Sequence, residues 1–273
     1  MIGGALAALV AGLSYWLRLL SFSGAVAALV VGFLIFGFGG IGFAGPLLAF
    51  FLSSSLLSQV GRKRKESINA LSAKGSTRDA MQVFANGGVA ALLAAVFPFL
   101  EAHRETALMM AIASLAAVNA DTWATEIGSL QRGSPWMVTT LRRVPAGTSG
   151  AVSWLGLLAA LLGSLFIGLV GVLTWPPRSI HILWQPEVPE LLAVVWAGFL
   201  AALADSILGG GLQAQYRCLR CGALTERKTH CPNAPVRLGR GFRWMTNDLV
   251  NLIASLLGAL FVWFLLAFFV YPA

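Results

Sequence analysis

Three aspartates with polar neighbours stand at the ends of strongly apolar segments of this 273-residue chain. Asp121 follows Asn119-Ala, Asp205 precedes Ser-Ile-Leu-Gly-Gly-Gly, and Asp248 follows Asn247. A carboxylate buried at the end of an apolar helix needs a partner, so we expect the three aspartates to share one polar centre. Carboxylate and amide oxygens are the ligands that Mg²⁺ prefers, which predicts a magnesium site. Helix capping by Asn247 or Asp248, the simpler alternative, accounts for one of these residues and not for the whole cluster.

A polar stripe opens the apolar segment that begins near residue 82. Arg78, Gln82 and Asn86 are spaced four residues apart, so they share one face of the expected helix. Such a face is not expected to point at lipid. The stripe therefore predicts either a part of the polar centre or a seam of hydrogen bonds between helices.

The loop after Asp121 has the composition of a phosphate site. Arg142 and Arg143 are followed by Gly147-Thr-Ser-Gly150 at the start of the next expected helix. Arginine binds phosphate oxygens in bidentate fashion, and the amides of a helix N-terminus favour anions, so the loop predicts a phosphate cradle. It does not match the Walker P-loop pattern, and an ordinary capped helix after a basic loop would look similar.

All three cysteines of the chain lie close together in one polar loop. Cys218, Cys221, His230 and Cys231 offer four nitrogen and sulfur ligands, which is the number that a structural zinc ion takes. The adjacent His-Cys pair is atypical of zinc fingers, and three reduced thiols without a metal are the alternative. A disulfide is disfavoured on the cytoplasmic side of a membrane.

The composition indicates a membrane protein. The chain is 58% hydrophobic and 11% charged, whereas about 25% of the residues of soluble proteins are charged. A membrane-spanning helix needs about 20 mostly apolar residues. Eight stretches qualify, at about 2–20, 23–38, 41–60, 82–100, 106–128, 148–175, 189–208 and 248–271. We predict an all-α integral membrane protein, a polytopic bundle of about eight transmembrane helices that forms a single domain over residues 1–273.

The basic residues predict the orientation of the bundle. They gather in the loops at 61–79, 129–147 and 209–246, and only Arg104 and Arg178 fall on the other side. The side rich in basic residues is expected to be cytoplasmic, which places both termini outside and the polar centre at the cytoplasmic face. Because the net charge of +8 is concentrated in these loops, we expect no nucleic-acid partner.

The order of the polar motifs resembles a membrane family that contains plant phytyl-phosphate kinase and animal transmembrane protein 19. The resemblance covers about residues 50–260. The motifs that carry it are Lys74…Arg78-Asp79…Gln82…Asn86-Gly-Gly, Asn119-Ala-Asp121-Thr-Trp-Ala-Thr-Glu126-Ile-Gly, Gly147-Thr-Ser-Gly150, Ala-Asp205-Ser-Ile-Leu-Gly-Gly and Asn247-Asp248-Leu-Val-Asn251.

One motif is also distantly similar to CTP-dependent polyprenol and phytol kinases. It is Asp121-Thr-Trp-Ala124-Thr-Glu-Ile-Gly128. The next motif of those kinases, Lys-Ser/Thr-x-Glu-Gly, is replaced here by Thr-Leu-Arg142-Arg143-Val-Pro-Ala-Gly147.

The resemblance implies a Mg²⁺-dependent kinase that converts a prenyl monophosphate, such as phytyl phosphate, to the prenyl diphosphate used in tocopherol synthesis. CTP is the implied phosphoryl donor, and the lipid substrate would enter from the cytoplasmic leaflet of the bilayer. Asp121, Asp205 and Asp248 would bind the metal in catalysis, with Glu126 as a fourth acid. The residues implied to orient or bind the phosphates are Asn119, Asn247, Asn251, Lys74, Arg78, Asn86, Arg142 and Arg143.

Three other functions compete with this hypothesis. A cytidylyltransferase would use the same metal and CTP but release diphosphate and form a CDP-lipid. A transporter would use the buried acids as a permeation site, and its polar residues would continue toward the outside, whereas here they stop at the cytoplasmic ends of the segments. A purely structural membrane protein would leave three buried acids unexplained.

Overall fold

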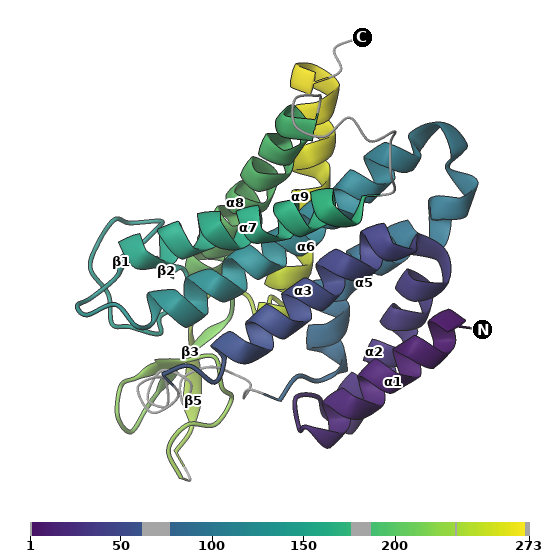
Figure 1. Ribbon diagram of the computed structural model, residues 1–273. Coiled ribbons are helices and arrows are strands. Elements are labelled where there is room, and N and C mark those ends of the chain that lie inside the picture. The colour runs from purple at the N-terminus through teal and green to yellow at the C-terminus, as the bar shows by residue number, and fades with distance from the viewer. Residues whose placement is uncertain (1, 62–76, 176–186, 233, 271–273) are drawn as a thin grey trace.

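The fold is a bundle of apolar helices, and the computed structural model describes residues 2–61, 77–175, 187–232 and 234–270. Lys74 therefore lies outside the described residues. The α-helices of the described part are α1 Ile2–Trp16, α2 Phe22–Leu34, α3 Ile41–Leu57, α5 Ala80–Val96, α6 Arg104–Gly128, α7 Trp154–Thr174, α8 Glu187–Gly211 and α9 Asn247–Leu265 (Figure 1). These eight helices confirm the predicted all-α polytopic bundle.

Six of these helices, some with an adjoining turn, are long and apolar enough to cross a membrane by length and composition. The other two, α1 and α3, are shorter apolar helices of 15 and 17 residues. The difference matters because about 20 residues are needed to cross the hydrocarbon core without thinning it.

Short polar side chains begin several of the helices. Ser21 accepts a hydrogen bond from the Gly24 amide at the start of α2, and Asp79 forms a reciprocal capping box with Gln82 at the start of α5. Ser153 caps α7 by accepting from the Gly156 amide. Each cap satisfies an amide that the first helical turn would otherwise leave unpaired.

The start of α7 corrects the sequence-based prediction. We expected this helix to begin near residue 148, directly after the Gly147–Gly150 motif. Gly150 instead has a φ of 80°, and a short strand, β2 Ala151–Val152, pairs with β1 Trp136–Met137 before the helix begins. The positive φ, which favours glycine, turns the chain into the strand and delays the helix to Trp154.

Helix α6 forms the centre of the bundle. Every residue from Ala111 to Ala120 is buried, and α6 packs against α3, α5, α7, α8 and α9 (Figure 1). A helix that is apolar around its whole circumference is expected in such a position. Half of these buried residues are alanines, which leave room for neighbouring helices to approach closely.

Glycines on the neighbouring helices complete this close packing. A methyl group added at Gly258 of α9 would lie 2.7 Å from the Ala113 carbonyl oxygen and 2.9 Å from the Ala117 Cβ. One added at Gly198 of α8 would lie 2.8 Å from the Ala116 Cβ. These contacts fix α8 and α9 along α6, so that polar residues near the ends of the helices meet at one level.

A small antiparallel sheet lies between α8 and α9 in the sequence. It consists of β3 Gln215–Cys218, β4 Leu224–Thr225 and β5 Val236–Arg240, in the order β4-β3-β5. Tyr216 of β3 pairs with Thr225 on one side and with Leu238 on the other. This sheet corrects the expectation from the sequence, which predicted a loop over residues 209–246.

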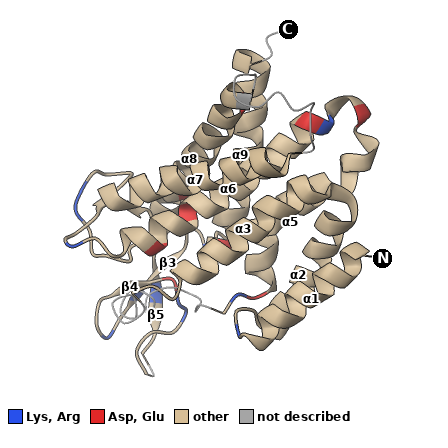
Figure 2. Ribbon diagram, in the orientation of Figure 1, with Lys and Arg blue, Asp and Glu red and all other residues tan. Residues whose placement is uncertain are grey.

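The charged residues gather at the ends of the helices. Figure 2 shows Lys and Arg mainly on the loops and on the sheet at one end of the bundle, with few charges along the helices themselves. The turn between α1 and α2 meets the start of α5 at this end, because the Ser21 amide donates to the Arg78 carbonyl oxygen at 2.9 Å. The orientation, with both termini outside, stays a prediction.

The packing of α6 against α9 predicts that Gly258→Ala destabilises the bundle. The added methyl group would press on the α6 backbone, and overpacking of this kind costs about 1–3 kcal/mol. The matched control is Gly88→Ala on α5, where an added Cβ meets no atom within 4 Å. Thermal unfolding of both variants in detergent should show a lower midpoint for Gly258→Ala alone. Equal midpoints would contradict the close contact between α6 and α9.

Candidate functional site

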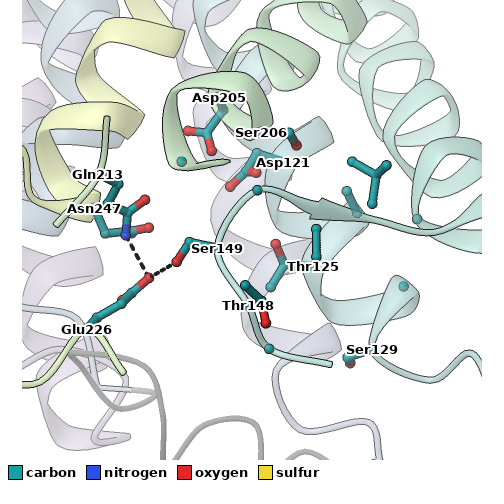
Figure 3. Close-up of a pocket in the computed structure, with 18 of the residues that line it drawn as sticks. Asp121, Thr125, Ser129, Thr148, Ser149, Asp205, Ser206, Gln213, Glu226 and Asn247 are labelled. Carbon is teal, nitrogen blue, oxygen red and sulfur yellow. Dashed lines mark hydrogen bonds between the residues drawn. The ribbon is translucent and has the colours of Figure 1, made fainter. Parts of the chain in front are cut away.

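A cavity of about 880 Å³ lies where the ends of α6 and α8 meet the starts of α7 and α9. The lining contains all four acids that the sequence analysis selected, together with Asn247. They are Asp121, Glu126, Asp205 and Asp248. Figure 3 shows Asp121 and Asp205 facing the same space from two different helices. The four acids thus line one cavity, as expected for a shared polar centre.

Asp121 and Asp205 are in the last part of α6 and α8, respectively. Asp205 is buried, and the negative charges of Asp121 and Glu226 act on its carboxylate. Carboxylates that repel one another in a poorly hydrated site are stabilised by a cation or by hydrogen-bond donors. The arrangement is therefore suited to binding a positively charged group.

Asn251 provides one hydrogen-bond donor to this cluster. With its amide nitrogen turned toward Asp205, Asn251 lies 3.1 Å from Asp205 Oδ2 and 3.3 Å from the Asn247 carbonyl oxygen, and it donates to both. In the opposite orientation the nitrogen faces Asn86 Oδ1 at 3.4 Å. We favour the first orientation because an ionised carboxylate only accepts hydrogen bonds. Asn251 thus links α9 to the acid of α8.

The start of α9 is capped by a residue that the sequence analysis did not consider. Thr246 is the N-cap, and its hydroxyl accepts from the Leu249 amide at 3.4 Å. Asn247 and Asp248 follow within the first helical turn, and Asp248 is buried. Capping therefore does not explain either residue, although an acid in the first turn also interacts favourably with the helix dipole.

Glu226 is a cavity residue that the sequence analysis missed. Its Oε1 accepts hydrogen bonds from Ser149 Oγ at 2.6 Å and from Gln213 Nε2 at 2.7 Å (Figure 3). It follows β4 and so brings the sheet to the loop at 147–150 and to the segment after α8. No apolar pattern surrounds Glu226 in the sequence, which is why it did not stand out.

Arg240 also connects the sheet, the loop at 147–150 and the end of α8. Its Nη2 donates to the Ser149 carbonyl oxygen at 3.0 Å, the Gly209 carbonyl oxygen at 3.3 Å and Gln215 Oε1 at 2.9 Å. Burial lowers the pKa of Arg240. Gly150 also packs directly on Gly210, where any side chain at Gly150 would collide with the α8 backbone. The loop at 147–150 is thereby fixed against the end of α8.

Arg78 lies beside the cavity and not in its lining. Its guanidinium donates to Ser54 Oγ at 2.8 Å and stacks over the rings of Phe50 and Phe51. Burial lowers the pKa of Arg78, and the negative charge of Glu126 partly offsets this effect. Arg78 therefore contributes positive charge near Glu126 while its hydrogen bonds connect α5 to α3.

Several predicted phosphate ligands do not line the cavity. Asn119 is fully buried and donates from Nδ2 to the Gly163 carbonyl oxygen at 2.7 Å, which joins α6 to α7. Arg143 stacks over Trp136, and Arg142 is exposed on the same loop. Asn86 lines a smaller, apolar cavity between α1, α2, α3 and α5.

Other basic residues line the cavity where Arg142 and Arg143 were expected. They are Arg227, Lys228 and Arg243. Two of them follow Glu226 directly, and the third precedes α9. The sequence analysis counted them only toward the positive charge of the loop, because no nearby motif singled them out.

The acids do not form a compact metal cage. In the described part of the chain, one group of Cys, His, Asp or Glu residues has at least three ligand atoms that all lie within 4.8 Å of one another. It consists of Cys218, Cys221, His230 and Cys231, and it contains no acid. The three aspartates do not converge to this degree. Mg²⁺ commonly binds through one or two carboxylates, water and substrate phosphates, so the pair Asp121 and Asp205 suits it better than a set of three.

Comparison with known proteins finds relatives that align with most of the chain. It is 32% identical over 268 residues to Protein PGR of Arabidopsis thaliana, an alignment that covers 92% of this chain and 91% of the relative. It is 31% identical over 245 residues to an uncharacterized membrane protein of Methanocaldococcus jannaschii, covering 89% and 84%. It is 29% identical over 245 residues to Protein VTE6, chloroplastic, of Arabidopsis thaliana, covering 88% of this chain and 63% of the relative.

No solved structure matches the chain. The family described as Integral membrane protein DUF92 matches residues 5–259, which include the whole cavity. The family membership that the motifs indicated is thereby confirmed: the chain is an integral membrane protein of the DUF92 family.

Proposed function

We propose that this protein is a Mg²⁺-dependent prenyl-phosphate kinase. The observation that carries the proposal is the cavity in which Asp121 and Asp205 face each other while Arg227, Lys228 and Arg243 line the wall. Phosphoryl transfer asks a protein for a metal site, cationic contacts and positioning more than for covalent chemistry. The similarity to Protein VTE6 and the motifs shared with plant phytyl-phosphate kinase support this reaction.

The metal would bind between the acids of two helices. Asp121 of α6 and Asp205 of α8 would hold Mg²⁺, and Asp248 in the first turn of α9 lines the same cavity. A bound divalent cation neutralises charge on phosphate oxygens during transfer. The repulsion of Asp205 by Asp121 and Glu226 supports such a cation, because a positive ion would offset the negative charge that burial makes unfavourable.

The phosphates would bind on the polar side of the cavity. The loop at 147–150 is held in place by Glu226 and Arg240, so its amides and the Thr148 hydroxyl line a fixed wall. Arg243 and Lys228 supply positive charge on the opposite segments. These groups would hold the prenyl monophosphate and the γ-phosphoryl group of the nucleotide in line.

The lipid chain of the substrate would lie against the apolar part of the cavity. This wall is formed by Leu157 and Ala160 of α7 and by Ala202 and Leu203 of α8. A prenyl chain there would extend from the polar cluster toward the membrane. The gathering of basic residues in the loops at this end of the bundle supports an entrance at the cytoplasmic leaflet.

In the proposed reaction an oxygen of the prenyl phosphate attacks the γ-phosphorus of the nucleoside triphosphate. The bond from that phosphorus to the bridging oxygen breaks, and nucleoside diphosphate leaves with the electron pair. The attacking oxygen is already anionic, so no strong general base is required. Resemblance to polyprenol and phytol kinases makes CTP the proposed donor.

The proposal predicts that Asp121→Asn and Asp205→Asn abolish turnover without unfolding the protein. Each change removes one negative charge from the proposed metal site, and we expect turnover to fall by about 100-fold or more. The assay supplies purified protein in detergent with Mg²⁺, phytyl monophosphate and CTP or ATP, and it measures prenyl diphosphate by mass spectrometry. The control is Glu101→Gln, an exposed acid outside the cavity lining.

An Asp121→Asn or Asp205→Asn variant with wild-type turnover would refute the assignment of these acids. Folding is checked separately by the thermal unfolding midpoint and by elution as a single species in detergent. Loss of turnover in Glu101→Gln would show that the assay responds to unspecific changes in charge.

A second prediction separates the cationic residues of the cavity from the arginines on the exposed loop. Arg243→Gln should raise the KM for a phosphate substrate about tenfold or more, since a hydrogen bond to a charged group contributes about 1.5–3 kcal/mol. Arg132→Gln, on an exposed residue outside the lining, is the control and should leave KM unchanged. If Arg142→Gln raises KM and Arg243→Gln does not, phosphate binding belongs to the exposed loop.

A further inference from the structure

Four metal-binding side chains meet on the three-stranded sheet, away from the cavity lining. Cys218 ends β3 and is buried, Cys221 lies in the tight turn that follows, and His230 and Cys231 lie between β4 and β5. Their ligand atoms all lie within 4.8 Å of one another. Residues from two separate segments of the sheet thus face one point.

The distances agree with a tetrahedral centre. Cys221 Sγ and Cys231 Sγ each lie 3.5 Å from His230 Nδ1. Zinc bonds of about 2.3 Å to sulfur and about 2.0–2.1 Å to nitrogen at tetrahedral angles separate neighbouring sulfur and nitrogen ligands by about 3.6 Å. The two distances to His230 match this separation, and all four ligand atoms lie within 4.8 Å of one another, which is compatible with one shared zinc ion.

The backbone supports thiolate ligands at the turn between β3 and β4. The Gly222 amide donates to the Cys218 carbonyl oxygen at 2.9 Å, and the φ of 74° at Gly222 lets the chain turn back into β4. The backbone amides of Cys221 and Arg220 donate hydrogen bonds to the Cys218 sulfur. The thiolate is the form that binds metal.

We propose that Cys218, Cys221, His230 and Cys231 bind one structural zinc ion, with His230 coordinating through Nδ1. All four ligand positions come from the protein, which is typical of a structural site and leaves no open position for catalysis. The ion would hold β3, β4 and the segment before β5 together. Such a clamp suits a sheet of short strands that has few residues to form a core of its own.

The proposed zinc site has a consequence for the cavity. The segment between Cys221 and His230 carries Glu226, Arg227 and Lys228, all of which line the cavity. Glu226 is the residue that accepts from Ser149 and Gln213. The zinc ion would therefore keep these side chains at the wall of the cavity. That this wall binds phosphate rests on the proposed function.

The test measures zinc in the purified full-length protein by mass spectrometry of the metal, after preparation in buffer without added zinc. We expect about one zinc ion per chain. Cys221→Ser and His230→Asn should each lose most of the zinc. The matched control is His103→Asn, because His103 is exposed just before α6 and is not part of the cluster. His103→Asn should keep the zinc of the wild type.

Cobalt substitution tests the ligands directly. Wild-type protein loaded with Co²⁺ should show the visible absorption of a tetrahedral cobalt–thiolate centre, and Cys221→Ser should change its intensity and position. If the cysteine variants do not fold, removal of zinc from the folded wild type with a chelator replaces them. Removal should speed tryptic cleavage after Arg227 and Lys228, because the segment that carries them would no longer be held at its ends, and addition of Zn²⁺ alone should restore protection.

Two outcomes would overturn the zinc site. One is wild-type protein with negligible zinc, three thiols that react freely and no cobalt–thiolate absorption. The other is a disulfide among the three cysteines in protein purified under mildly reducing conditions. Zinc content does not depend on turnover, so zinc without kinase activity would contradict the proposed function alone, and kinase activity without zinc would contradict the zinc site alone.

Discussion

Close packing of small side chains around α6 is the constraint on which the site depends. Residues 111–120 of this helix are all buried, and Gly198 and Gly258 let α8 and α9 lie directly against its alanines. In lipid, helices gain little from burying apolar side chains against one another, so contact area between backbones becomes decisive. Since the helices are fixed along their length, Asp121 and Asp205 reach the same level at the end of the bundle.

The second half of the site comes from the segments outside the helices. Glu226, directly after β4, and Arg240 of β5 both contact Ser149. Glu226 accepts a hydrogen bond from the Ser149 hydroxyl, and Arg240 donates to the Ser149 carbonyl oxygen. The loop at 147–150 is thus fixed by the sheet, by α8 and by the glycine contact at Gly210. An acidic helix end and a polar loop line the same cavity, an arrangement that would suit the two phosphate groups of the proposed reaction.

The sequence predicted the parts of the structure that have a strong local signal. The helices appear as long apolar segments, and the carboxylates are recognisable because buried charge is rare in such segments. The sheet was not predicted because its strands are only two to five residues long, too short for the alternation of β3 and β5 to stand out in the sequence. Glu226 is recognised as a cavity residue only from its contacts with Ser149 and Gln213. These residues lie 77 and 13 positions away in the sequence, so no local pattern connects them to Glu226.

The loop arginines show a different limit of sequence reasoning. Two adjacent arginines before a Gly-Thr-Ser-Gly motif have the right composition for a phosphate site, yet Arg143 stacks on Trp136 and Arg142 is exposed. Composition could not decide between these positions, because the turn at Gly150 and the pairing of β1 with β2 set the direction of the loop. Asn119 likewise joins two helices although its neighbours line the cavity.

The fate of a labelled phosphate tests the central claim most directly. Purified protein would receive prenyl monophosphate and Mg²⁺ with CTP labelled either at the γ-phosphate or at the α-phosphate. A prenyl-phosphate kinase transfers the γ label alone to the lipid and releases CDP. Appearance of the α label in the lipid, with release of diphosphate, would contradict this account and identify a cytidylyltransferase.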